Sequence, residues 1–221
     1  MRFLCKKTDM NVWVITDEAL YQEMMVTTAS PEISIKRINK PDQIDTQQTD
    51  FAIIDLLFDS KDPNHLQVLL NTGANLILVN EVTETCAGWP DHVIRFNGWP
   101  GFLRRSMTEI TGGSLNSRKQ AGEIMQLLGR EAEWVPDVRG MLTARVVCMI
   151  INEAFFALNE KISTETEIDT AMKLGTNYPW GPFEWCKLLG IRNVYPLLEK
   201  LATEHPRYQP AALLQQRALA Q

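Results

Sequence analysis

The chain has 221 residues, of which 45% are hydrophobic and 22% charged, with a formal net charge of −5 at pH 7. This length and apolar content suffice for one large domain or two small ones, each with its own core. The acidic balance and the lack of a long basic run argue against nucleic acid as a partner. The longest apolar run, residues 146–151, is far shorter than the roughly 20 residues of a membrane helix.

The four cysteines are scattered along the chain at Cys5, Cys86, Cys148 and Cys186. They form no CxxC pair and no histidine lies at ligand spacing, so we expect neither a metal site nor a disulfide framework. The first ten residues contain no apolar stretch long enough for a signal peptide. We therefore expect a cytoplasmic protein.

Short strand-like runs alternate with helical runs in the first half of the chain. Strands are predicted from β-branched content and apolar patterning at residues 11–16, 33–38, 51–58, 75–80 and 92–96, with a short strand-like piece at 133–138. Helices are predicted at residues 18–28, at 64–73 with Gly73 as C-cap, and at 114–131 with Ser114 as N-cap. Strands alternating with helices indicate a mostly parallel sheet.

From residue 137 onward the pattern is helical only. Four helices are predicted, at residues 140–161, 163–175, 192–204 and 210–220. The second begins with a capping box of the Ser-x-x-Glu type in two overlapping registers and ends at Gly175. The predicted architecture is α/β plus all-α: a truncated, Rossmann-like parallel-sheet domain over residues 1–136 and a small helical domain over 137–221.

The helical half resembles the C-terminal domain of the 3-hydroxyacyl-CoA dehydrogenases. The resemblance rests on "GMLTARVVCMIINEAFFALNE" and "IDTAMKLGTNYPWGPFEW", in which Ile168-Asp169, Met172, Gly175, Pro179 and Gly181-Pro182 occupy family positions. It extends from residue 137 to about 214, is weaker over 51–137 and is poor before that. It implies a helical domain like the C-terminal domain of 6-phosphogluconate dehydrogenase, and a role in fatty-acid and acyl-CoA metabolism.

The segment "GTNYPWGP" after the second predicted helix has tightly specified loop chemistry. Its prolines fix φ and its glycines permit close backbone approach, so we interpret them as fold determinants. The resemblance also implies that residues near the substrate end or the subunit contact are Arg145, Asn152, Glu153, Asn177, Pro179, Gly181 and Pro182.

The family uses NAD, and a dinucleotide requires a glycine-rich turn between the first strand and its helix. Here that turn reads Asp17-Glu18-Ala19-Leu20, and no glycine precedes Gly73. The two carboxylates oppose an anion at this position, so we expect no bound cofactor. Asp55 and Asp59 follow a buried strand, where a family carboxylate faces the cofactor; a strand-end carboxylate facing water is the alternative.

The resemblance also identifies the positions at which the family places its catalytic groups. A histidine acts as base, and the matching stretch "VIRFNGWPGF" offers Arg95 or Asn97 in its place, neither of which can accept a proton near neutral pH. Glu109 in "MTEITGG" matches the glutamate that orients the histidine. Thr83 is a possible substitute for a substrate-binding serine, and Ala144 replaces an asparagine.

These losses predict a family member without NAD-dependent dehydrogenase activity of its own. It would bind acyl-CoA, or pair through its all-α domain with a second copy or an intact relative, a role favoured by the broad apolar face of residues 141–158. Two alternatives stay open. One is an active 3-hydroxyacyl-CoA (3-hydroxybutyryl-CoA) dehydrogenase with Glu109 as base and Thr83 as donor; the other is a structural subunit that binds no small ligand.

Overall fold

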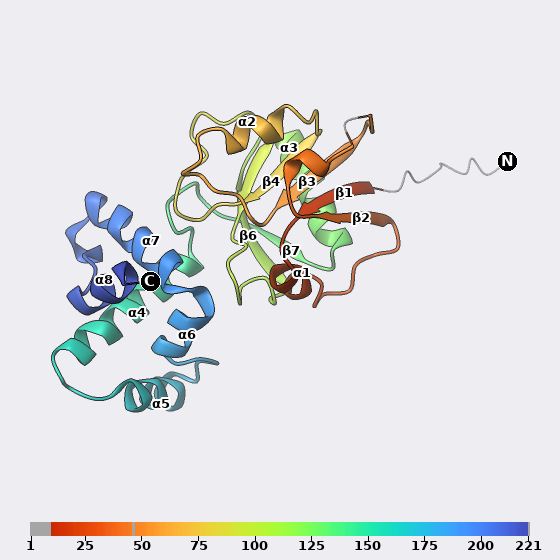
Figure 1. Ribbon diagram of the computed structural model, residues 1–221. Coiled ribbons are helices and arrows are strands. Elements are labelled where there is room, and N and C mark those ends of the chain that lie inside the picture. The colour runs from red at the N-terminus through yellow and green to blue at the C-terminus, as the bar shows by residue number, and fades with distance from the viewer. Residues whose placement is uncertain (1–9, 46, 221) are drawn as a thin grey trace. The chain divides into compact units, whose positions relative to one another are not determined.

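The computed structural model describes residues 10–45 and 47–220, which form two compact units (Figure 1). The first, called here the sheet unit, contains the chain up to residue 81 together with residues 85–137. The second, the helical unit, contains residues 82–84 and the chain from 138 onward. No pattern in the sequence predicts that the short segment 82–84 joins the helices.

A seven-stranded sheet organises the sheet unit, with strand order β2-β1-β3-β4-β5-β6-β7. All neighbouring strands are parallel except β5 and β6. The strands are β1 (Met10–Ile15), β2 (Ile33–Ile38), β3 (Phe51–Asp55), β4 (Leu76–Asn80), β5 (Val93–Phe96), β6 (Met107–Gly112) and β7 (Glu131–Trp134). The predicted mostly parallel sheet is confirmed.

Strand limits differ from the prediction at three places. β3 ends at Asp55 and not at residue 58, because the Asp55 carboxylate accepts a hydrogen bond from the Leu57 N–H at 2.8 Å and turns the chain. The strand-like piece at 133–138 lies earlier, at 131–134. β6 was not predicted, since its pairing with β5 is antiparallel and depends on residues more than ten positions away.

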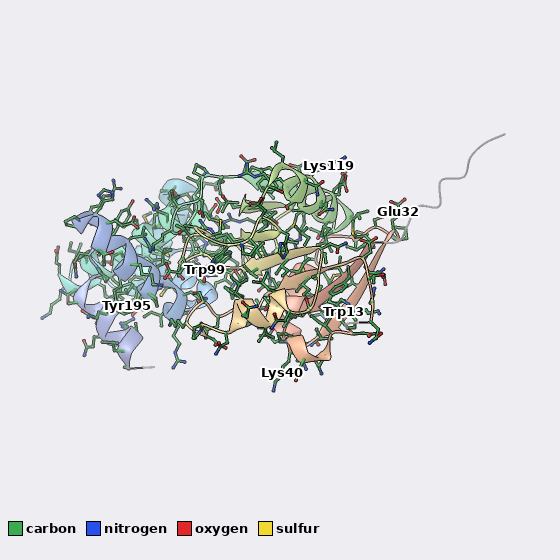
Figure 2. All side chains as sticks on the ribbon, turned by 90° about the horizontal axis from the view of Figure 1, so that it is seen from above. Trp13, Glu32, Lys40, Trp99, Lys119 and Tyr195 are labelled. Atoms are coloured by element: carbon green, nitrogen blue, oxygen red, sulfur yellow. The ribbon has the colours of Figure 1, made fainter. Side chains whose placement is uncertain are left out.

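Helices cover both faces of the sheet. α1 (Glu18–Met24) and α3 (Leu115–Leu127) pack on the face that presents Val14 and Ile54. α2 (His65–Leu70) and the short helix η1 (Pro41–Gln43) lie on the face that presents Ile53. Figure 2 shows the strands between α3, which carries Lys119, and the segment that carries Lys40.

Two of these helices are shorter than predicted. α1 stops at Met24, because the chain beyond it is held to the end of α3, where the Thr27 hydroxyl donates to the Leu128 carbonyl at 2.7 Å. α2 ends before Gly73, which occupies the following turn with φ of +78°. In α3 the predicted N-cap is confirmed, since the Ser114 hydroxyl accepts from the Ser117 N–H, but the helix ends at residue 127 and not 131.

The helical unit has five α-helices in its described part, one more than predicted. They are α4 (Thr143–Asn159), α5 (Glu165–Thr176), α6 (Pro182–Leu189), α7 (Ile191–Glu204) and α8 (Ala212–Leu219), with the short helix η2 (Pro206–Tyr208) before α8. The missed helix is α6. α5 begins at a capping box between Thr164 and Glu167, and it continues to Thr176, one residue past the predicted end.

The segment 82–84 is fixed to the helical unit by hydrogen bonds and charge. The Gly140 N–H donates to the Val82 carbonyl at 2.7 Å. Glu84 forms ion pairs with Lys200 on α7 and, at 3.1 Å, with Arg139. Within the described ranges, no helix combines the length and apolar composition that crossing a bilayer requires.

Candidate functional site

The carboxyl ends of β1 and β3 mark the position where α/β sheets of this kind bind ligands. β1 pairs with β2 on one side and with β3 on the other. The strand order therefore reverses at β1. Such a switch point is the usual binding edge for nucleotides. The residues that follow the two strands therefore decide what the edge can hold.

The N-terminus of α1, which follows β1, is already occupied by a carboxylate of the chain. Asp17 is its N-cap and accepts a hydrogen bond from the Leu20 N–H at 2.8 Å. Glu18 in the first turn forms an ion pair with Arg37. A pyrophosphate needs these N–H groups and the positive end of the helix dipole. It would meet two carboxylates here instead, so the residues do not fit NAD at this edge.

Asp55, at the end of β3, is completely buried and does not face water. Its carboxylate lies 2.9 Å from Nε2 of His65 and also accepts from the Leu57 N–H. Nδ1 of His65 accepts from the Asp59 N–H at 3.2 Å, so both ring nitrogens have partners. The hydrogen bond to Asp55 raises the pKa of His65. Asp59 itself is exposed, as a strand-end carboxylate facing water would be.

Sequence reasoning did not identify His65. Its pairing with Asp55 joins the start of α2 to the end of β3, ten residues apart, and no spacing rule signals it. Phe58 packs on the imidazole with ring centroids 5.0 Å apart. The Asp55–His65 pair therefore fills the space at the carboxyl end of β3 with side chains of the chain itself.

Asn97 and Glu109 form a second polar pair, where β5 ends beside β6. Nδ2 of Asn97 donates to Oε2 of Glu109 at 3.3 Å, and the Asn97 N–H donates to the Glu109 carbonyl at 2.9 Å. Both residues are buried. The other candidate for the histidine position, Arg95, is fully buried and binds Asp137 at 2.6 Å. Asn97 is thus in direct contact with Glu109.

The side-chain amide of Asn80 forms hydrogen bonds at the end of β4. Oδ1 of Asn80 accepts from the Gly98 N–H at 2.9 Å, and Nδ2 donates to the Leu56 carbonyl at 3.2 Å. Gly98 has no room for a side chain, since a Cβ would lie 2.9 Å from Cγ of Asn80. The amide links the ends of three neighbouring strands.

Thr83 and Glu109 belong to different units. Thr83 is half-buried in the 82–84 segment of the helical unit, whereas Glu109 is on β6 of the sheet unit. The alternative active enzyme would therefore take its base, Glu109, from the sheet unit and its donor, Thr83, from the helical unit.

Three of the residues assigned by resemblance lie on α4. The Arg145 guanidinium donates to the Arg139 carbonyl through Nε at 3.0 Å and Nη2 at 2.8 Å. Asn152 is buried; its Nδ2 donates to the Gln209 carbonyl at 2.9 Å, and its Oδ1 accepts from the Ala211 N–H at 2.8 Å. Glu153 is exposed. Arg145 and Asn152 therefore hold backbone segments of the helical unit in place.

The loop between α5 and α6 is fixed by its contacts with α5. Asn177 ends α5 in the left-handed conformation with φ of +55°. Asp169 accepts from the Phe183 N–H at 2.8 Å and so caps α6, while a Cβ on Gly181 would lie 2.4 Å from Asp169. Pro182 is buried at the first position of α6, where its missing N–H costs nothing, and Pro179 is exposed.

Large apolar side chains are exposed on the helical unit. Leu142 and Val146, at the start of α4, are 61% and 49% exposed. Met149 and Ile150, which continue the same face, are half-buried. Because residues i, i+4, i+7 and i+8 lie on one side of a helix, these four form an apolar stripe.

Three of the four thiols lie in the described part of the chain. Cys148 and Cys186 are free and buried, and burial raises the pKa of Cys186 to about 11. Cys86 is half-buried, and Cys5 lies outside the described residues. In the part of the chain that the structure covers, no three His, Cys, Asp or Glu side chains are placed to hold a metal ion.

Comparison with known proteins assigns this architecture. Residues 140–221 match the family model described as 3-hydroxyacyl-CoA dehydrogenase, C-terminal domain. The 3-hydroxyadipyl-CoA dehydrogenase of Escherichia coli K12 is 43% identical over 106 residues, which are 47% of this chain and 22% of that protein. A probable 3-hydroxybutyryl-CoA dehydrogenase of Bacillus subtilis is 31% identical over 113 residues, which are 49% of this chain and 39% of that protein. The chain spans less than half the length of these relatives.

Solved structures show the same fold. The (S)-3-hydroxybutyryl-CoA dehydrogenase of Ralstonia eutropha superposes with a TM-score of 0.73 at 19% identity, over 95% of this chain and 93% of that one. A 3-hydroxybutyryl-CoA dehydrogenase of Escherichia coli K12 gives a TM-score of 0.57 at 34% identity, over 66% of this chain and 32% of that one.

The fold is therefore that of a Rossmann-like sheet domain joined to a helical dehydrogenase domain. The helical unit is a domain of the 3-hydroxyacyl-CoA dehydrogenase C-terminal type, and the chain is similar to members of that family.

Proposed function

We propose that this chain is a 3-hydroxyacyl-CoA dehydrogenase-like protein of acyl-CoA metabolism that transfers no hydride to or from NAD itself. It works as a partner subunit, bound through its helical unit to a second copy or to an intact dehydrogenase.

The observation that carries the proposal is the hydrogen bond between Asn97 and Glu109. The resemblance implies a histidine next to this glutamate, as the base that removes the hydroxyl proton. An amide does not titrate and cannot accept that proton. Here its Nδ2 donates to Glu109 at 3.3 Å, in a buried position, so the pair is a satisfied structural contact.

The switch-point edge supports the same conclusion. The Asp17 carboxylate accepts from the Leu20 N–H, one of the donors at the start of α1 that a pyrophosphate would need, and Asp55 is enclosed by His65. Changing Asn97 to histidine would thus supply a base without supplying a place for the cofactor.

The apolar stripe on α4 supports a partner at the helical unit. Leu142 and Val146 expose about half or more of their surface, on a helix whose opposite face is fully packed. Contiguous exposed apolar side chains on a helix are typical of protein–protein contacts.

The activity is tested by NADH absorbance with acetoacetyl-CoA and a large excess of protein, in wild type, Asn97→His and Glu109→Gln. We expect no fall in any of the three, while an intact relative of the family oxidises NADH at once. A fall in wild type that Glu109→Gln abolishes would contradict the proposal and restore the alternative active enzyme. NADH fluorescence titration should likewise show no saturable binding.

The partner role is tested by sedimentation velocity of the protein alone and with an intact 3-hydroxybutyryl-CoA dehydrogenase. We expect an assembly that Val146→Lys dissociates and that Val26→Lys leaves intact, since Val26 is 61% exposed but lies in the sheet unit. A monomer both in the protein alone and in the mixture would contradict the subunit role.

Calorimetric titration with acetoacetyl-CoA tests whether the protein also binds acyl-CoA. Saturable binding without turnover would support this form of the proposal.

A further inference from the structure

A pocket of about 330 Å³ opens on the helical unit, where α4, α5, α6 and α8 meet beside the turn from α6 into α7. Its volume lies in the range of small-molecule sites, which are about 300–1,000 Å³. Its wall combines apolar and polar surface, so a guest would meet both kinds of group. All of its lining residues belong to the helical unit.

The floor of the pocket consists of buried apolar side chains. Phe155 on α4 and Phe183 on α6 pack with their ring centroids 5.1 Å apart and their planes tilted by 58°. Cys186 and Ile191 complete the floor, and none of the four residues is more than 8% exposed. A carbon skeleton resting on this floor would remove its remaining apolar surface from water.

The rim of the pocket carries one negative and two positive side chains. Arg217 on α8 forms an ion pair with Glu165 at 2.7 Å, and its guanidinium lies 5.4 Å from the ring centroid of Phe155. Lys187 is exposed and has no ion pair among the described residues. Burial raises the pKa of the Cys186 thiol, whereas the charges of Arg217 and Lys187 act to lower it, so both cations lie near the floor. The rim has a net positive charge.

We propose that this pocket binds a small apolar carboxylate, with its carbon skeleton on the floor and its carboxylate at Lys187 and Arg217. Lys187 supplies a charge that no carboxylate of the rim neutralises. A guanidinium has five N–H donors, so Arg217 can contact a second carboxylate while it keeps Glu165.

The size and charge of the pocket exclude other guests. An ammonium ion would meet a rim of its own sign, and a CoA thioester is far larger than the pocket. The site is therefore separate from the acyl-CoA binding considered above, and it does not depend on whether the chain transfers hydride.

Isothermal titration calorimetry tests the charge of the guest with two probes of equal chain length, octanoate and octylammonium. We expect saturable binding of octanoate and binding of octylammonium that is weaker by about tenfold or more, because the rim attracts one head group and repels the other. Absence of saturable octanoate binding, or equal affinities for the two probes, would overturn the proposal.

A charge reversal at the rim tests the role of Lys187. Lys187→Glu changes an exposed side chain and should weaken octanoate binding by about fivefold to tenfold. Lys161→Glu is the control, since it makes the same change in net charge at an exposed residue after α4 that does not line the pocket. Equal effects of the two variants would show that the carboxylate does not bind at Lys187.

A crystal soaked in 6-bromohexanoate locates the guest independently of its affinity. An anomalous bromine peak against Phe155 and Phe183 supports the site. A peak elsewhere on the molecule, or none at a concentration that saturates the calorimetric titration, would overturn it.

Discussion

The carboxylate of Asp169 on α5 accepts a hydrogen bond from the backbone N–H of Phe183 at 2.8 Å, and so it caps a helix to which it does not belong. Gly181, the N-cap of α6, passes so close that a Cβ there would lie 2.4 Å from Asp169. The loop sequence between the two helices is restricted because a side chain from the first helix fills the space at the start of the second.

Substitutions in this contact should destabilise the helical unit. Asp169→Ala removes the cap and should lower the free energy of unfolding by about 1–2 kcal/mol. Gly181→Ala should cost more, about 2–3 kcal/mol, because the new methyl group overlaps the carboxylate. Urea unfolding followed by circular dichroism measures both.

The control is Gly175→Ala, in the last turns of α5. A Cβ there meets nothing within 4 Å. This change should raise the free energy of unfolding by about 0.5–1 kcal/mol, since alanine loses less backbone entropy in a helix. Equal destabilisation by the two glycine variants would show that the crowding at Asp169 is not the cause.

The pair of Asp55 and His65 should make the stability of the sheet unit depend on pH. The hydrogen bond to Asp55 raises the pKa of His65 in the folded state. The stabilisation is therefore complete below the ordinary histidine pKa and is lost as the pH rises through the raised value. Melting temperatures measured from pH 5 to 9 should fall over this window in wild type.

His65→Gln should remove this pH dependence, whereas His92→Gln, a half-buried residue of the same unit, should leave it in place. A melting temperature of wild type that rises through the same window would contradict the assignment. It would indicate that the hydrogen bond from the Asp59 N–H to Nδ1 keeps the imidazole neutral.

The ion pairs of Glu84 should contribute modestly to the helical unit. Burial raises the pKa of Glu84, but the hydrogen bonds from Lys200 and Arg139 outweigh it and hold the pKa below its ordinary value. The stabilisation is present above the ordinary glutamate pKa and is lost as the pH falls through the lowered one. Glu84→Gln should cost about 0.5–1 kcal/mol at neutral pH, because the pairs are partly exposed.

Urea unfolding at low and high salt distinguishes this effect from lost packing. Salt screens partly exposed charges, so the cost of Glu84→Gln should shrink at high ionic strength. Lys200→Met should be less harmful in the Glu84→Gln background than in wild type. Additive costs would show that the two side chains do not interact.

Asn152 and Glu153 are neighbours in sequence with opposite expected effects. Asn152→Ala leaves the buried Ala211 N–H without its partner and removes the hydrogen bond to the Gln209 carbonyl, and it should cost about 2–4 kcal/mol. Glu153→Ala changes an exposed side chain and should stay within about 0.5 kcal/mol. Similar effects of both on acyl-CoA binding, with stability unchanged, would instead assign the pair to a ligand site.

The sequence predicted those parts of the fold that depend on neighbouring residues. β2 is found at the predicted residues 33–38, and Ser114 caps α3 as expected, because alternation and capping are local properties. α6 was missed: it has eight residues, and its Phe183 N–H is satisfied by Asp169 from another helix. β6 was missed because its antiparallel pairing with β5 is not a local property.

For the candidate site, the sequence by itself determined which side chains are available. A turn without glycine and with two carboxylates after the first strand is unsuited to a pyrophosphate whatever the packing, and neither Arg95 nor Asn97 can act as a base. Only the tertiary structure decided that Asn97 is the neighbour of Glu109, and that His65 encloses Asp55. The residue types fix the available protons and charges, whereas their pairing depends on which strand ends and helix starts the fold brings together.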